Sequence, residues 1–273
     1  MRNLEIKTYK ELEEHLLAFR KSDMKLLILV SGAGLGKTTI CNSIFTNNRT
    51  INSHITKLAL YKALYEVHLN TDTTIIIDEA EILFKSTAIK SMLKILCDTT
   101  PIRTIRYESY TPLLYKEGLP TSVTISNKVV MILNELTQTD TQIVAIKDRA
   151  HEINFKPNSS EIMEHIIDIY HDVYDAGIID FMNEFVYSKQ MIGRLSIRDY
   201  VHAVEYKKAG LSTWRKELLN RWGLSELDNA LDTLSKKYTG YGRIGKIHKE
   251  LVGMGLYNKS SKTFYRLSKK VGI

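Results

Sequence analysis

Apolar runs of strand length alternate with stretches of helical periodicity in the first half of the chain. The runs at 25–30 and 128–133 begin with a lysine and are otherwise apolar, and residues 75–77 are three isoleucines. Such runs are typical of parallel strands that are buried on both faces of a sheet. Residues 8–22 predict an amphipathic helix before the first strand, and residues 55–60 predict a strand that passes into a helix.

The second half of the chain has a different pattern. Residues 159–208 show helical periodicity throughout and predict an α-helical segment. Further helices are predicted at 211–222, 224–238 and 243–256, and a strand is predicted at 263–267.

Residues 102–125 predict an insertion between a helix at 86–98 and the strand at 128–133. The alternation at 102–107 and the β-rich residues 123–125 indicate a hairpin or an extended loop. One interpretation is a surface that faces DNA or a central pore; the other is a solvated edge hairpin. The residues that would contact a phosphate backbone are Arg103, Arg106, Tyr107, Tyr115 and Lys116.

The first apolar run leads into a glycine-rich turn and then into a helix. Backbone N–H groups of such a turn converge on an anion, and the helix N-terminus adds partial positive charge. We expect Lys37 to reach the β and γ phosphates of a nucleotide and the Thr38 hydroxyl to ligate Mg²⁺. Ser31 stands where the usual pattern begins with Gly or Ala, and we expect this small residue to be tolerated. The expected nucleotide-binding residues are Gly32, Ala33, Gly34, Leu35, Gly36, Lys37, Thr38 and Thr39.

Two carboxylates follow the run of isoleucines. Asp78 and Glu79 stand at the C-terminal end of this predicted strand, where open α/β sheets bind their ligands. We expect Asp78 to hold Mg²⁺, commonly through water, and Glu79 to polarise the attacking water as a general base.

With these two blocks the sequence resembles the AAA+ ATPases, in which they are called Walker A and Walker B. The resemblance covers about residues 22 to 208 and extends to three later polar positions. Asn134 follows an apolar strand, as sensor 1 does, and would orient the attacking water. Arg149 occupies the place of the arginine finger, although the Ser-Arg-Cys block of clamp loaders is here Asp148-Arg149-Ala150. Arg198, with Arg194 in reserve, matches the sensor 2 arginine that reports nucleotide state to the lid.

The resemblance implies an α/β fold, with a parallel P-loop NTPase sheet in an αβα sandwich. We expect this core at 1–157, an α-helical lid at 158–209 and a small C-terminal helical, winged-helix-like domain at 210–273. An arginine finger acts on the nucleotide of the next subunit, so the resemblance also implies self-association into a ring or spiral.

The positive charge is concentrated at the C-terminus. The net charge of the chain is +7, while residues 236–273 contain ten Lys or Arg and one Glu, which gives +9 and leaves −2 for the rest. A basic helix at 243–256 followed by a polar turn and a strand resembles a winged helix, whose helix would enter the major groove of DNA. Phosphate contacts would come from Lys246, Lys249, Lys259, Lys262 and Arg266. The alternative is a basic cap that packs on a neighbouring subunit.

Composition excludes several other classes. With 25% charged and 44% hydrophobic residues, the chain has the composition of a globular protein. No apolar run is long enough to span a membrane, and we expect a cytoplasmic protein. The spacing of Cys41 and Cys97 does not suit zinc, so we expect both cysteines to be buried apolar residues.

These observations predict an ATPase that hydrolyses ATP with Mg²⁺, is oligomeric and acts on DNA, as clamp loaders, initiators or helicase loaders do. Two rivals remain open. One is a protein remodeller whose basic tail binds a protein, and the other is a P-loop kinase of a small molecule. Stimulation by DNA that is lost with residues 236–273 would argue against the first, and turnover without a phosphate acceptor against the second.

Overall fold

The structure is a computed structural model that describes residues 4–51, 55–107, 112–135, 141–186, 194–224 and 226–271. The chain divides into two compact units, residues 1–165 and 166–273. Each unit is described by itself.

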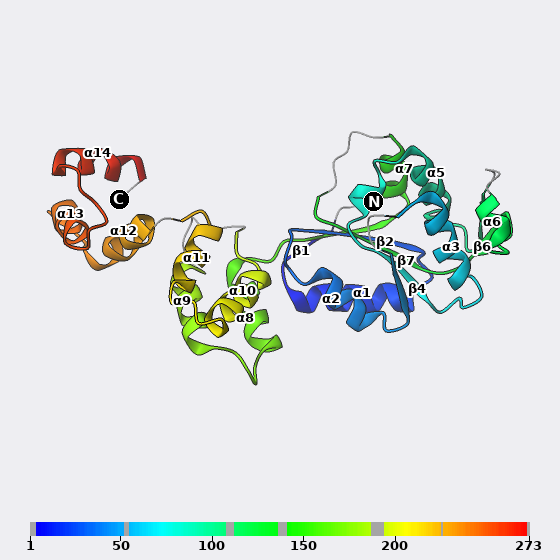
Figure 1. Cartoon of the computed structure of the whole chain (residues 1–273), viewed down its shortest axis with the longest axis horizontal. Helices are drawn as coiled ribbons and strands as arrows, with labels where there is room; N and C mark the ends of the chain where they lie inside the picture. Colours follow the sequence, from blue (N-terminus) through cyan, green and yellow to red (C-terminus); the bar gives the residue numbers. More distant parts are fainter. Residues whose placement is uncertain are drawn as a thin grey trace. The chain divides into compact units, whose positions relative to one another are not determined.

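A six-stranded parallel sheet forms the centre of the first unit (Figure 1). Its strand order is β1-β8-β2-β7-β4-β3. The central strand β2 pairs in parallel with β7 on one side and with β8 on the other, and β4 pairs with β7. The C-terminal end of β7 therefore lies between those of β2 and β4, which carry the glycine-rich turn and the acidic pair. The strands are β1 (Leu4–Ile6), β2 (Leu26–Ser31), β3 (Asn48–Ile51), β4 (Thr74–Ile77), β7 (Val129–Leu133) and β8 (His151–Phe155).

Helices cover both faces of this sheet, which confirms the predicted α/β sandwich (Figure 1). Successive side chains of a strand point to opposite faces of the sheet. Those of β2 and β4 are buried on both faces because helices cover both. One face packs against α1 (Tyr9–Lys21) and α2 (Lys37–Ile44). The other packs against α3 (Lys57–Val67), α5 (Thr87–Leu96) and α7 (Thr141–Asp148). A short helix, α4 (Ala80–Leu83), follows β4 directly.

The strand predicted at 55–60 is wrong. Strand β3 lies earlier, at Asn48–Ile51, and the predicted segment contains the start of α3. The reason is a helix cap: the Thr56 side chain accepts a hydrogen bond of 3.2 Å from the backbone N–H of Ala59. An N-cap threonine supplies one of the acceptors that the first turn of a helix lacks.

The predicted insertion is a hairpin. Strands β5 (Arg103–Arg106) and β6 (Ser122–Ile125) pair antiparallel, with α6 (Pro112–Lys116) between them in sequence. Two of the residues that one interpretation assigned to DNA contact are buried, because Arg103 is 2% exposed and Tyr107 is 6% exposed. They occupy the inward side of the two-residue alternation, whereas Arg106 and Tyr115 are exposed.

Helices make up the second unit. The first four are α8 (Ser159–Ile169), which begins in the first unit, α9 (Ala176–Val186), α10 (Ile197–Lys208) and α11 (Trp214–Arg221). Ser196 caps α10, with Asp199 completing a capping box.

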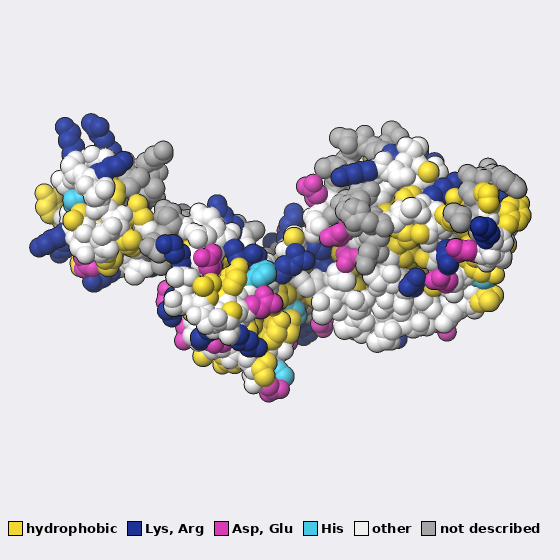
Figure 2. Space-filling model, in the orientation of Figure 1, with side chains coloured by type: hydrophobic (Ala, Val, Ile, Leu, Met, Phe, Trp, Pro, Cys, Tyr) yellow, Lys and Arg dark blue, Asp and Glu magenta, His cyan; other side chains and the backbone are white. Residues whose placement is uncertain are grey.

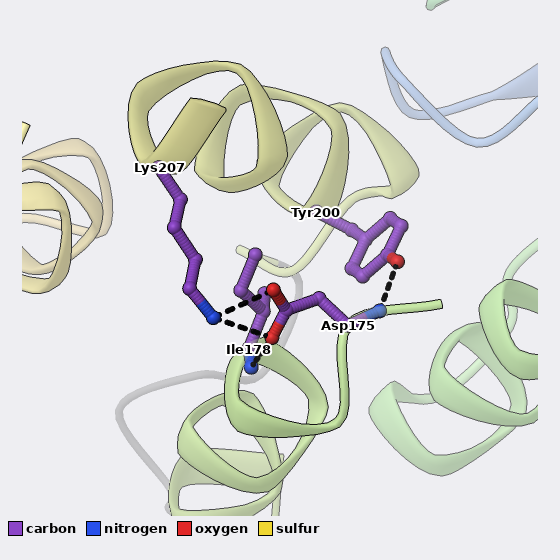
Figure 3. Close-up of polar contacts among 4 residues, drawn as sticks. All are labelled: Asp175, Ile178, Tyr200 and Lys207. Atoms are coloured by element: carbon purple, nitrogen blue, oxygen red, sulfur yellow. Dashed lines mark hydrogen bonds and ion pairs between the residues drawn. The ribbon is translucent and has the colours of Figure 1, made fainter. Parts of the chain in front are cut away.

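A polar cluster fixes the start of α9 (Figure 3). The Asp175 carboxylate accepts hydrogen bonds of 2.8 and 2.6 Å from Lys207 of α10, and its backbone N–H donates to the Tyr200 hydroxyl. The bond from Lys207 lowers the pKa of Asp175. The cluster ties α9 to α10.

Helix α11 packs with α9 and α10. Arg221 forms an ion pair of 3.2 Å with Asp199, and the ring of Trp214 lies edge-on to Phe181 at 5.4 Å. The last three helices have a hydrophobic core of their own. We therefore propose that the lid includes α11 and that the C-terminal domain begins after it.

The strand predicted at 263–267 is also wrong. The C-terminal helices are α12 (Glu226–Lys237), α13 (Arg243–Gly253) and α14 (Ser261–Val271). Phe264 is 0% exposed and Ser268 is 1% exposed, so the buried positions follow the four-residue spacing of a helix. Among the described residues nothing forms the wing of a winged helix.

Both cysteines are free and buried, as predicted. Burial raises the pKa of each thiol to about 12. No helix within the described ranges is long and apolar enough to cross a membrane.

Candidate nucleotide-binding site

Two glycines give the turn after β2 its shape. Gly34 and Gly36 have φ values of 74° and 75°, in the left-handed region that only glycine adopts without strain. Gly36 occupies the N-cap position of α2. The loop therefore ends on a helix N-terminus, the arrangement that binds phosphate groups in many proteins.

Lys37 is held across the mouth of this loop. The residue is 7% exposed, and its ammonium donates hydrogen bonds to the carbonyl oxygens of Ser31 at 2.8 Å and Gly32 at 2.7 Å. A third bond of 3.0 Å goes to Oδ1 of Asn134. An ammonium has three donors, so Lys37 must exchange or share one of these bonds to reach a phosphate.

Thr38 and Asp78 lie in direct contact. The Thr38 hydroxyl donates a hydrogen bond of 2.8 Å to Oδ2 of Asp78, and Oδ1 accepts one from the backbone N–H of Glu79. A hydroxyl and a carboxylate so close together provide the oxygen ligands that Mg²⁺ prefers, and the ion usually takes its remaining ligands from phosphates and water. In the described part of the chain no group of three His, Cys, Asp or Glu residues could hold a metal by itself. The Thr38 hydroxyl and the Asp78 carboxylate fit an Mg²⁺ ion that takes its other ligands from phosphates and water.

Glu79 has an unusual backbone conformation. Its φ is 51°, the one positive value among the described residues other than glycine. Such a conformation costs about 1–3 kcal/mol and is often found at functional sites. The residue is exposed and lies beside Asp78.

Lys37, Thr38, Asp78, Glu79 and Asn134 thus all lie at the carboxyl edge of the sheet. They come from the start of α2, which follows the loop after β2, and from the ends of β4 and β7. Hydrogen bonds bring Lys37 to Asn134 and Thr38 to Asp78. Parallel strands present their carboxyl ends at one edge, so the sequence could predict this meeting.

Arg149 lies at the opposite edge. In the pairing of β8 with β2, His151 lies beside Leu27 and Phe155 beside Ser31. Arg149 precedes β8 by two residues and is therefore near the amino ends of the strands. Its Nη1 atom is buried and has no hydrogen-bond partner within the described residues. Arg149 is not part of the cluster around Lys37.

The two lid arginines differ in their contacts. Arg194 donates a hydrogen bond of 2.6 Å from Nη1 to the backbone carbonyl of Trp222. Arg198 is exposed on the first turn of α10.

Sequence reasoning missed Tyr9. Its hydroxyl donates a bond of 3.3 Å to the carbonyl of Leu35 in the loop, and its backbone N–H donates to Glu161 at 2.8 Å. Its ring also stacks on the ring of His165, with 3.5 Å between the ring centroids. Tyr9 thus connects the loop to α8. Nothing in the pattern at 8–22 distinguishes it from the other apolar positions of α1.

Comparisons with known proteins support the fold. No protein-family model matches the chain, and no curated protein matches its sequence. Structures of two mutant forms of Thermotoga maritima RuvB are each 16% identical to it, with a TM-score of 0.50 over 91% of this chain and 81% of RuvB. Domain III of the Thermotoga maritima replication initiation protein DnaA is 14% identical, with a TM-score of 0.47 over 78% of this chain and 90% of that domain. The chain has the α/β fold of the AAA+ P-loop NTPases.

Proposed function

We propose that the protein is an AAA+ ATPase that hydrolyses ATP with Mg²⁺. The contact between the Thr38 hydroxyl and the Asp78 carboxylate at the mouth of a glycine-rich loop carries this proposal. It joins the two sequence blocks that the activity needs, although they lie forty residues apart. The fold that the chain shares with RuvB agrees with it.

Each residue at this edge has a chemical role in the proposal. The loop and Lys37 bind the phosphates, and Thr38 and Asp78 hold the metal, which would neutralise charge on the phosphate oxygens. Glu79 accepts a proton from the attacking water, because a carboxylate next to the metal site is placed to act as a general base. Asn134 orients that water through its amide.

We further propose that the active form is an oligomer, a ring or a spiral. Arg149 lies at the amino edge of its own sheet, so it is remote from the loop of its own subunit. An arginine supplied by a neighbour raises the rate of phosphoryl transfer by about 10³-fold or more in related systems. Arg198 on α10 is proposed to report nucleotide state to the lid.

We propose DNA as the partner. The charge of residues 236–273 is +9, and the exposed basic residues of α13 and α14 include Lys246, Lys249, Lys262 and Arg266. Binding of basic surfaces to phosphates releases counterions, so the affinity must fall as salt is added. A replication-type role, in loading a clamp or a helicase or in initiation, suits an ATPase of this fold with a basic tail.

The test is ATPase activity of the full chain with and without single- and double-stranded DNA, at several salt concentrations. We expect Mg²⁺-dependent ATP hydrolysis whose rate per subunit rises with protein concentration. DNA should stimulate this rate at low salt. Lys37→Ala should abolish nucleotide binding or turnover, whereas Glu79→Gln should bind ATP without turning it over. Turnover that DNA leaves unchanged would favour the protein remodeller. Transfer of phosphate to a small molecule would favour the kinase.

A further inference from the structure

The last three helices form a separate small unit of packing. α12, α13 and α14 share a core made by Leu231, Leu234, Ile247, Leu251 and Phe264. Residues 254–260 connect α13 to α14, and Gly255 in this connection has a φ of 70°. α13 packs against both α12 and α14. Two helices joined by a turn with a left-handed glycine resemble helix-turn-helix proteins, although this connection of seven residues is longer than their usual turn of three or four.

Aromatic contacts fix α14 relative to α13. The rings of Tyr257 and Phe264 lie 5.1 Å apart, and the ring of His248 lies 5.3 Å from that of Phe264. Nε2 of His248 also lies 3.0 Å from the carbonyl oxygen of Lys259 in the connection. Because the turn is tied to α13 in this way, α14 presents a defined face to solvent.

That face is basic and carries one aromatic ring. Phe264 and Ser268 point inward, while Lys262, Tyr265 and Arg266 are exposed, Tyr265 by 52%. Positions i, i+3 and i+4 lie on one side of a helix. The three exposed side chains therefore form a single surface on the first turns of α14.

A single acidic residue lies within α13 and α14. Glu250 is the one acid after residue 235. It accepts hydrogen bonds from Lys237, at 2.9 Å, and from the Tyr238 hydroxyl, and so is engaged toward α12. Lys and Arg side chains project from the part of the chain that carries α13 and α14 (Figure 2).

We propose that α14 enters the major groove of double-stranded DNA, with Lys262, Tyr265 and Arg266 facing the groove and α13 lying across the backbone. This rests on the proposed action on DNA and names the form of DNA and the helix that reads it. The major groove is about 12 Å wide and admits an α-helix. In helix-turn-helix proteins the first turns of the second helix contact the base edges. α14 takes the place that we expected α13 and a wing to share.

The test compares two charge-matched double variants of the full chain. Lys262→Ala with Arg266→Ala removes two cations from α14, and Lys246→Ala with Lys249→Ala removes two from α13. Binding is measured by fluorescence anisotropy on a mixed-sequence pool of 30-base-pair duplexes and on single strands of equal length. All four altered side chains are exposed, so their removal should leave the fold intact. Circular dichroism checks that both variants keep the helix content of the wild type.

We expect the α14 variant to lose on the order of tenfold or more in duplex affinity and the α13 variant to lose less. A dye that occupies the major groove should displace the wild-type protein, whereas a minor-groove binder should not. Equal losses in both variants, or displacement by the minor-groove binder alone, would overturn the assignment of α14 while leaving DNA binding intact. A wild-type protein that binds neither duplex nor single strand at low salt would instead refute the proposed action on DNA.

Discussion

The ammonium of Lys37 donates a hydrogen bond of 3.0 Å to Oδ1 of Asn134, which lies 97 positions further along the chain. β2 and β7 are neighbours in the sheet, so the two residues that follow these strands meet at its edge. The bond connects the group proposed to bind phosphate to the group proposed to orient water. In the proposed mechanism Lys37 would turn to a phosphate, and Oδ1 of Asn134 would then be available to orient a water molecule.

Substitutions of Asn134 should separate nucleotide binding from turnover. In Asn134→Ala, Lys37 keeps two carbonyl partners, so we expect ATP binding close to wild type and turnover lower by about 10²-fold. In Asn134→Asp, a carboxylate beside the ammonium competes with the phosphates, so binding itself should weaken. Equilibrium binding of a fluorescent ATP analogue and steady-state ATPase rates measure the two effects. Equal Kd values for both variants would contradict the competition.

The position of Arg149 predicts complementation between subunits. Arg149→Ala and Lys37→Ala should each have little activity alone, because one lacks the arginine and the other lacks the phosphate contact. In a mixture, a Lys37→Ala subunit can supply Arg149 to the intact loop of an Arg149→Ala neighbour. We expect activity in the mixture well above the sum of the two variants, measured as ATP hydrolysis against mixing ratio.

A control for this mixing uses Arg106→Ala in place of Arg149→Ala. Arg106 is an exposed arginine of the hairpin, and its removal should leave the variant active without any mixing. If Arg149→Ala retains full turnover as an oligomer, the arginine-finger role is wrong.

Substitution of buried Arg103 should lower the free energy of unfolding, whereas substitution of exposed Arg106 on the same strand should not. It donates from Nη1 to the carbonyl of Leu96 at 2.6 Å and from Nη2 to the carbonyl of Asn127. Burial lowers its pKa. Arg103→Leu would leave two buried carbonyls without these donors, at a cost of about 2–4 kcal/mol in the free energy of unfolding. Arg106→Leu should change it by less than about 0.5 kcal/mol. Urea unfolding followed by circular dichroism compares the two, and equal midpoints would show that the buried bonds add nothing.

The sheet at the core of the fold, and the polar residues that follow its strands, could be predicted from the hydrophobic pattern of the sequence. Runs such as 25–30 and 75–77 are buried on both faces, and a strand of this kind admits few alternatives. The polar residues after each strand could then be placed at one edge, because parallel strands end together. For this topological reason Asn134 lies within hydrogen-bond distance of Lys37, and Asp78 within hydrogen-bond distance of Thr38.

The wrong predictions have local physical causes that the hydrophobic pattern does not show. Thr56 acts as a helix cap, so a β-rich stretch begins a helix. Residues 263–267 alternate like a strand, yet Phe264 and Ser268 are buried four positions apart against α13. Arg103 looked like a surface cation because its partners are backbone carbonyls, and nothing in a sequence marks a carbonyl as an acceptor. Tyr9 was missed for the same reason, since it contacts the carbonyl of Leu35.

Ser31, at the first position of the loop motif, predicts a substitution that does not lower stability. Its Oγ is buried and has no hydrogen-bond partner in the described part of the chain, whereas its carbonyl accepts from Lys37. Ser31→Ala removes a desolvated hydroxyl and keeps the carbonyl, so the free energy of unfolding should be unchanged or higher by about 1 kcal/mol. ATPase activity should stay within about twofold of wild type.

Ser86→Ala is the matched control for Ser31→Ala. The Ser86 hydroxyl caps α5 by accepting a hydrogen bond of 3.4 Å from the backbone N–H of Ile89, and losing such a cap costs about 1 kcal/mol. The midpoint of thermal unfolding should therefore fall by about 2–4 °C in Ser86→Ala, for a unit of this size, and stay unchanged or rise by up to about the same amount in Ser31→Ala. A Ser31→Ala protein that is as stable as wild type yet binds ATP more weakly would mean that the orphan hydroxyl serves the bound nucleotide, because it has no other partner to lose.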